Sequence, residues 1–390
     1  MGRHRSLTLW VFMLLASMAA ACYSSPAASP TASPAASPAA SPTPSPKVSP
    51  AANATAATDL TIVELDPKYA PYDVSGERYV SVGRDRELHL VDINTGESRQ
   101  LITDGQRKRE PAISGNYVAW IDQRKEINLG GSSRNAAENT ADDIYLLNLE
   151  TDELRLITDI PAKRRALRMS DRRLVWMSNR NELGEHYTHF DIYAYDVRSG
   201  EEIAVTIVPG AQSNPAVQGD SVVWGDNGNS PVMGTDKASC TRCAENEVDI
   251  YLYDFVTGGE RPIVQSGAIN RSPSVYRDYV VWEGTQPASE DAVWLLDLKT
   301  GEIRKITEVP GGMSRPQVSD QRVFWTVKAA CDVRPITKEG TGAFAHDLDT
   351  GIMLQLSGYV EPRVEIDSGI AVIAEGCFIP QRVFAVFLDG

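Results

Sequence analysis

From residue 59 to the end of the chain, short apolar runs alternate with polar segments in a pattern that returns throughout the body of the sequence. Its clearest element is an apolar run that ends in tryptophan, which occurs at 118–120, 175–176, 223–224, 281–282 and 324–325. A polar loop and a second apolar strand follow, and this strand begins Asp-Ile-Tyr at 143, 191 and 249. A repeat of this length determines the fold, so it is interpreted before any local motif.

A tight turn ends this second strand in most units. It has the form Asp-x-x-Thr/Ser-Gly at 92–96, 196–200, 254–258, 297–301 and 347–351, and the segment 148–152 has Asp in place of the glycine. Glycine supplies the positive φ that a tight hairpin needs, and the first Asp can accept backbone N–H bonds across the turn. Another short strand follows the turn, and a proline usually opens the next unit. Each unit is therefore expected to contain four antiparallel strands, a to d.

The number of units can be counted. Six full units start near residues 71, 110, 166, 214, 272 and 315, and a seventh starts at Pro362 but ends before a fourth strand. The run 60–65 precedes the first unit, alternates as strand d does, and otherwise has no partner. Four-stranded units in tandem bury their faces by packing radially. The sequence thus predicts an all-β, seven-bladed β-propeller whose ring is closed by the N-terminal strand joining the last blade.

The tryptophan strand, the Asp-Ile-Tyr strand and the Asp-x-x-Thr-Gly turn resemble the TolB-type repeats of bacterial periplasmic and cell-surface β-propellers. The resemblance extends over the whole of the repeated region, 59–390. Members of that family commonly act as protein-binding modules in envelope complexes, so the resemblance implies a binding role. The segment before the repeats does not resemble the N-terminal α/β domain of TolB, so a Tol-Pal role is not implied.

The segment 1–58, which precedes the repeats, predicts export. Residues 1–22 combine Arg3 and Arg5 with an apolar run from 7 to 21, as in a signal peptide. The end Ala-Ala-Ala-Cys resembles a lipobox, which makes Cys22 the lipidation site; a plain secretory signal is the alternative. Residues 23–58 are rich in Ala, Ser and Pro and predict a disordered tether reaching up to ~110 Å, or a leader without a mechanical role. We therefore expect a lipid-anchored, extracytoplasmic bacterial protein with its propeller at 59–390.

Charge narrows the choice of partner. Lys and Arg number 38 and Asp and Glu 52, a net charge of −14. This argues against a nucleic-acid surface, which needs an excess of basic side chains. An apolar share of 42% is enough for a substantial core.

Two features point to the end of the ring from which the d–a and b–c loops emerge. The b–c loops are long at 122–142, 178–189, 226–247 and 329–342 and predict a wall for binding; neutral loop growth is the alternative. Aligning the units on tryptophan places Arg109, Arg165 and Arg271 at one position, with Arg315 one residue later. Arginine forks pair with carboxylates, sulfates and phosphates. These residues could bind an acidic glycan or an acidic protein segment, or could instead bond locally to an aspartate such as Asp122 or Asp226.

Four cysteines remain beyond Cys22, and an even number in an exported protein favours disulfide bonds. Cys331 and Cys377 follow strand b in neighbouring blades, which predicts a cross-blade disulfide. Cys240 and Cys243 lie in one long loop and predict a short loop-stapling disulfide.

Catalytic and metal signatures are weak. The sequence has no Gly-x-Ser-x-Gly elbow, P-loop or His-Glu-x-x-His. His186 and His189 are three residues apart, but Asp191 belongs to the repeated strand motif, so the two histidines lack an obvious third metal ligand. The acidic stretches at 142–143 and 245–249 match no EF-hand, so no metal and no cofactor are expected. The tryptophans share one strand position and predict blade packing rather than sugar stacking.

The sequence therefore predicts a monomeric binding or scaffolding module for an envelope protein or an anionic glycan, acting through the long-loop face. The alternative is a polysaccharide-active enzyme, a lyase or hydrolase, using the same face. Some polysaccharide lyases use a seven-bladed propeller with His, Tyr and Arg, and the corresponding candidates here are His186, Tyr187, His189 and Arg165.

Overall fold

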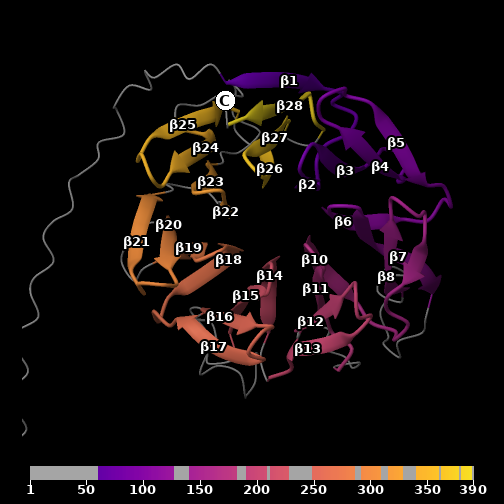
Figure 1. Ribbon diagram of the computed structural model, residues 1–390, viewed down its shortest axis with the longest axis horizontal. Helices are drawn as coiled ribbons and strands as arrows, with labels where there is room; N and C mark the ends of the chain where they lie inside the picture. Colours follow the sequence, from indigo (N-terminus) through magenta and orange to yellow (C-terminus); the bar gives the residue numbers. More distant parts are fainter. Residues whose placement is uncertain are drawn as a thin grey trace, which may run out of the picture. The chain divides into compact units, whose positions relative to one another are not determined.

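The protein forms seven four-stranded antiparallel sheets arranged around a centre, which confirms the predicted seven-bladed propeller (Figure 1). The computed structural model describes residues 60–126, 140–181, 190–208, 211–227, 248–285, 291–308, 315–327, 340–359, 362–376 and 379–388. Within these ranges no helix is long and apolar enough to cross a membrane.

The first four blades follow one another along the chain. Their strands are β2 (Asp73–Ser75), β3 (Arg78–Val82), β4 (Leu88–Asp92) and β5 (Ser98–Ile102); β6 (Lys108–Ser114), β7 (Tyr117–Glu126), β8 (Thr140–Asn148) and β9 (Leu154–Leu156); β10 (Arg164–Ser170), β11 (Arg173–Ser178), β12 (Asp191–Asp196) and β13 (Glu202–Thr206); and β14 (Gln212–Gln218), β15 (Ser221–Asp226), β16 (Asp249–Asp254) and β17 (Gly259–Val264).

The last three blades complete the ring. Their strands are β18 (Ile269–Tyr276), β19 (Tyr279–Thr285), β20 (Ala292–Asp297) and β21 (Ile303–Glu308); β22 (Gln317–Ser319), β23 (Arg322–Val327), β24 (Gly342–Asp347) and β25 (Met353–Ser357); and β26 (Arg363–Asp367), β27 (Ile370–Glu375), β28 (Arg382–Phe387) and β1 (Thr61–Leu65).

Ring closure is as the sequence predicts. The N-terminal strand β1 pairs antiparallel with β28, from Thr61 opposite Phe387 to Leu65 opposite Val383. Figure 1 shows the first and last strands of the propeller side by side in this one sheet, with β1 in indigo beside β28 in yellow. Arg382 adds two hydrogen bonds of 3.1 Å from Nε to the carboxylate oxygens of Glu64. The seventh blade therefore joins the two ends of the repeat.

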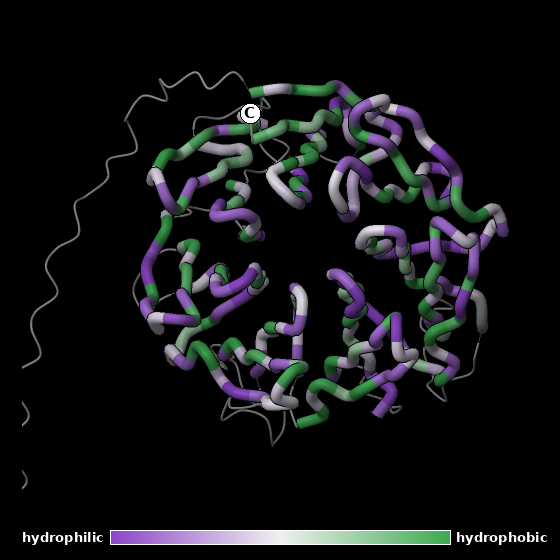
Figure 2. The backbone as a smooth tube through the Cα atoms, in the orientation of Figure 1, coloured by the Kyte–Doolittle hydropathy of each residue, from purple (hydrophilic) through white to green (hydrophobic). Residues whose placement is uncertain are grey.

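The predicted packing role of the tryptophans is also observed. All five are at most 3% exposed. Four of them stack on the aromatic residue directly opposite on strand c, with ring centroids 5.8–6.3 Å apart. Aromatic pairs of this kind add to the stability gained by burying apolar area. Figure 2 shows many hydrophilic residues along the inner strands and hydrophobic residues on the strands behind them.

The repeated turn has the predicted geometry. At 92–96 the Gly96 N–H donates to the Asp92 carbonyl at 2.9 Å, and the Asp92 carboxylate accepts the Thr95 N–H at 2.9 Å. The last turn position has a positive φ in every copy, including Asp152 at 55° where glycine is missing. These turns lie at the opposite end of the ring from the d–a and b–c loops. We call this end the turn face and the other end the loop face.

A side chain on one inner strand bonds to the backbone of the next blade at every seam. Aspartate, glutamate, serine and glutamine fill this role in turn, and only one of the seven donates rather than accepts. The pairs are Asp73 with Ile113 N–H, Glu110 with Ala166 N–H, Ser170 with Gly219 N–H, Gln218 with Arg277 N–H, Ser274 with Val318 N–H, Gln317 with the Val364 carbonyl, and Asp367 with Gly76 N–H.

Candidate functional site

The candidate site is built on the seven inner strands, which surround the centre of the ring (Figure 1). Strand pairing gives each inner residue a height relative to the tryptophan of its blade. One residue beyond the tryptophan, towards the loop face, the inner strands carry Arg109 opposite Ile121, Arg165 opposite Met177, Ser213 opposite Gly225, and Arg271 opposite Glu283. The alignment of the three arginines that the sequence predicts is therefore observed.

The last two blades extend this layer. Blade 7 places Arg363 opposite Ala374, two residues before Glu365, and Arg315 precedes Gln317 by the same two residues in blade 6. We refer to Arg109, Arg165, Arg271, Arg315 and Arg363 as the arginine ring. All but Arg109 are exposed. Because no described strand lies inside the inner strands, exposed side chains on them face the centre of the ring or its end.

A β-bulge explains why Arg315 is one residue out of line with the others. In blades 2 to 5 an extra residue follows the arginine layer, and its φ is positive: 47° at Glu110, 53° at Ala166, 50° at Asn214 and 50° at Ser272. Blade 7 pairs without a shift in register. A bulge re-aims the strand and is common beside functional sites.

The members of the arginine ring differ in their contacts. Arg109 forms a 2.8 Å ion pair with Asp142, so local bonding holds for this residue, but with a carboxylate of strand c rather than Asp122. Arg165 lies over the ring of Phe190 at 5.4 Å, and Arg363 lies over Tyr72 at 5.3 Å. Arg271 and Arg315 make no hydrogen bond or ion pair with any residue in the described ranges.

Buried polar residues precede the arginine layer in four of the blades, and one of them helps to position Arg109. The residue just before each arginine of blades 2, 3 and 5, and before Ser213, is at most 2% exposed: Lys108, Arg164, Gln212 and Asn270. Arg164 donates to the backbone carbonyl of Asp142 and, at 2.6 Å, to that of Ile160, and its own N–H donates to the Asp142 carboxylate at 2.9 Å. Asp142 is thereby fixed where it binds Arg109.

A second layer lies beneath the arginine ring, opposite the residue that precedes the tryptophan position. Its seven members are Asp73, Ala112, Arg168, Ala216, Ser274, Gln317 and Glu365. In this layer the two blades next to Arg168 carry alanines, Ala112 and Ala216, and Arg168 is exposed. Two carboxylates, Asp73 and Glu365, stand on neighbouring blades. This layer thus carries both signs of charge under a ring of arginines.

The two carboxylates have strongly raised pKa values. Burial raises the pKa of Glu365 to about 8. The charge of Asp73 also raises this pKa, whereas the charges of Arg168 and Arg363 lower it. Burial likewise raises the pKa of Asp73 to about 7, against N–H bonds from Ile113 at 2.8 Å and Val74 at 3.0 Å. Below these pH values the layer loses negative charge, and the arginine ring above it becomes the dominant charge.

Stability should therefore depend on Glu365. Between its ordinary pKa and about 8, the unfolded chain is ionised at this residue while the folded protein holds the proton, so rising pH weakens folding through this range. Replacing Glu365 with Gln should remove this penalty and stabilise the protein at pH 8 by ~2 kcal/mol after allowance for solvent screening. Melting temperatures at pH 5 to 8 would measure it, with the exposed Glu97→Gln as control. Parallel curves for wild type and Glu365→Gln would contradict the prediction.

Other predicted residues lie outside the described ranges: Cys22, Cys240, Cys243, Cys331, Cys377, His186, Tyr187 and His189. The same holds for 127–139, 182–189, 228–247 and 328–339, which include most of the long b–c loops. The loop predicted at 122–142 is shorter than expected, because β7 extends to Glu126 and β8 starts at Thr140. Among the described residues, no group of three or more His, Cys, Asp or Glu could hold a metal ion.

Sequence reasoning missed Arg363 and the second layer. Blade 7 has no tryptophan on which to align Arg363. The available signal was the apolar run at 370–374, which occupies the place of the tryptophan strand in this blade; Arg363 pairs with its last residue, Ala374. Asp73, Arg168 and Glu365 share a layer only through strand register, which the sequence does not display.

No protein-family model matches the chain, and no curated protein sequence matches it. Solved structures do. The β-propeller domain of the trilobed protease from Pyrococcus furiosus aligns with a TM-score of 0.55 at 15% identity, over 84% of this chain and 94% of that one. An oligogalacturonate lyase in complex with manganese aligns with a TM-score of 0.54 at 12% identity, over 85% and 91%.

TolB from Acinetobacter baumannii is also among the similar structures, with a TM-score of 0.40 at 12% identity. The alignment covers 83% of this chain but 63% of that protein. This score is too low to support a conclusion. Sequence identities as low as these establish the fold alone, so the comparisons place the chain among β-propellers and no more narrowly.

Proposed function

We propose that the chain is an extracytoplasmic, lipid-anchored propeller of TolB type that binds an anionic ligand at its loop face. The observation that carries the proposal is the arginine ring: an acidic protein places five arginines at one height around the centre of the ring. Two of them, Arg271 and Arg315, are exposed and make no hydrogen bond or ion pair with any of the described residues. Guanidinium groups pair with carboxylate and sulfate in a bidentate manner, which suits an acidic glycan or an acidic protein segment.

The proposed cellular location of the protein rests on its sequence. The apolar run at 7–21, the Ala-Ala-Ala-Cys end and the Ala/Ser/Pro-rich segment support export, lipidation at Cys22 and a tether. Such a tether would hold a binding module away from the membrane. Disulfides between Cys331 and Cys377 and between Cys240 and Cys243 belong to the same proposal, because exported proteins retain them.

Titration with polygalacturonate, a uronate polymer, tests the proposal by calorimetry. The purified full-length chain should bind it and should not bind neutral dextran. The double variant Arg271→Ala/Arg315→Ala should bind about tenfold more weakly, or ~1.4 kcal/mol. The matched control Arg99→Ala/Arg304→Ala removes the same charge from exposed outer strands and should bind as wild type does. Equal binding by both double variants would refute the site, and cleavage of the polymer would favour the polysaccharide-active enzyme.

A further inference from the structure

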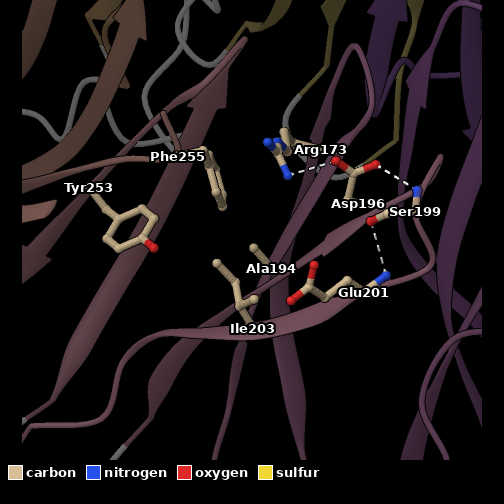
Figure 3. Close-up of a pocket in the computed structure, with 8 residues that line it drawn as sticks. All are labelled: Arg173, Ala194, Asp196, Ser199, Glu201, Ile203, Tyr253 and Phe255. Atoms are coloured by element: carbon tan, nitrogen blue, oxygen red, sulfur yellow. Dashed lines mark hydrogen bonds and ion pairs between the residues drawn. The ribbon is translucent and has the colours of Figure 1, made fainter. Parts of the chain in front are cut away.

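A second site lies at the turn face, away from the arginine ring. A pocket of about 290 Å³ opens between blades 3 and 4 (Figure 3). Tyr253 and Phe255 of blade 4 form one wall, and Ala194 and Ile203 of blade 3 form an apolar floor. Neither the repeat nor the proposed anion site accounts for this cavity.

The aromatic wall is fixed by its neighbours. Tyr253 and Phe255 pack edge to face, with ring centroids 5.2 Å apart and an interplanar angle of 78°. The guanidinium of Arg173 lies over Phe255 at 4.1 Å, so it covers one face of that ring. Both aromatic residues are only half-buried. The wall is thus preformed and still open towards the cavity.

The arginines beside the pocket are neutralised. Arg173 forms ion pairs with Asp196 at 2.8 Å and with Asp220 at 3.1 Å. Arg172 approaches the same two carboxylates at 3.3 and 3.5 Å. Two arginines and two aspartates therefore balance each other. Asp196 also accepts a hydrogen bond from the Ser199 N–H, so its carboxylate already has partners within the chain.

Within the described ranges, two further carboxylates beside the pocket, those of Glu201 and Glu260, are not neutralised in this way. Glu201 lines the pocket and is exposed, and its carboxylate pairs with no residue in the described part of the chain. Figure 3 shows this carboxylate facing the cavity across from Tyr253. A second carboxylate, Glu260, stands directly opposite Tyr253 on the neighbouring strand β17. A cation entering the pocket would meet aromatic surface and unpaired acid together.

We propose that this pocket binds the side chain of a lysine on a partner protein. Four methylenes would lie along Ile203 and Tyr253, and the ammonium would reach Glu201. Ammonium groups are attracted both to carboxylates and to aromatic faces. A second guanidinium would compete with Arg173 for Phe255, and an anion would be repelled. The net charge of −14 favours approach of a basic partner.

Calorimetric titration of the full-length chain with the peptide acetyl-Gly-Lys-Gly-amide tests this. Wild type should bind it, and the same peptide with an acetylated ε-amine should bind at least fivefold more weakly. Glu201→Gln should reproduce that loss with the unmodified peptide. The matched control is Glu302→Gln, which follows the same turn in blade 5 and is likewise exposed; it should leave binding unchanged.

Several results would overturn the proposal: no binding by wild type, equal binding of the acetylated peptide, or equal losses in Glu201→Gln and Glu302→Gln. Equal binding of the acetylated peptide would mean that the ammonium group is not recognised. Equal losses in the two variants would mean that general attraction to an acidic surface accounts for the binding. Because Glu201 is exposed, its replacement does not threaten the fold. The outcome is also independent of polygalacturonate binding at the loop face.

Discussion

Removing residues 1–67 should unfold the propeller or lower its melting temperature by more than ~10 °C, whereas removing residues 1–58 should leave the melting temperature unchanged. The two variants differ in whether β1 is present. Without β1, blade 7 loses five paired residues and the buried side chain of Leu65, which is 7% exposed. The lost hydrogen bonds and apolar burial together amount to about 5 kcal/mol.

The loss spreads beyond one strand. β28 is almost wholly buried, with Val383, Phe384, Ala385 and Val386 at most 1% exposed, and removing β1 opens its edge. An exposed apolar edge strand also promotes aggregation. Thermal melting followed by circular dichroism, with light scattering for aggregates, measures both effects. A chain starting at residue 68 that melts at the wild-type temperature would show that β1 does not close the ring.

A smaller effect is expected where closure depends on charge alone. Arg382→Ala removes the contact with Glu64, which lies on the surface. Surface ion pairs contribute about 0–1 kcal/mol, so this variant should melt within ~3 °C of wild type. The comparison separates strand pairing from electrostatics at the same seam.

The fold could be predicted because its information is repeated. Each blade restates the same tryptophan, the same Asp-x-x-Thr-Gly turn or the same spacing, so one ambiguous unit is corrected by the others. Even the closure could be inferred, since the strand at 60–65 had no partner and the last unit lacked one. Asp152 shows the limit of the motif: it takes the positive φ of a glycine, and only the other copies of the turn reveal the equivalence.

The site could be predicted only in part, because its geometry depends on register. Arg109, Arg165 and Arg271 were found by counting from tryptophan, which works where the bulge is present. In blade 7 there is neither a bulge nor a tryptophan, so Arg363 was missed. The lysine pocket combines residues of two blades, and no spacing in the sequence brings Glu201 to Tyr253.

Arg164→Met should destabilise the protein by about 3–5 kcal/mol, a loss expected when one partner of a buried charged network is removed. Arg164 is fully buried, and burial together with the nearby charge of Arg180 lowers its pKa to about 10, so it is still charged at neutral pH. Its guanidinium donates to the carbonyls of Asp142 and Ile160, which would be left without this donor. Methionine fills the volume but donates no hydrogen bond.

The matched control is Arg165→Met, the same substitution at the next residue. Arg165 is exposed and contacts only the Phe190 ring in the described part of the chain, so its replacement should cost less than ~1 kcal/mol. Urea denaturation gives the free energy of unfolding for both variants. Because Arg164 fixes Asp142, and Asp142 holds Arg109, Arg164→Met should also weaken polygalacturonate binding under conditions where the protein stays folded. Equal stability of the two variants would mean that the buried guanidinium does not support the loop face, and that the arginine ring is held by strand pairing alone.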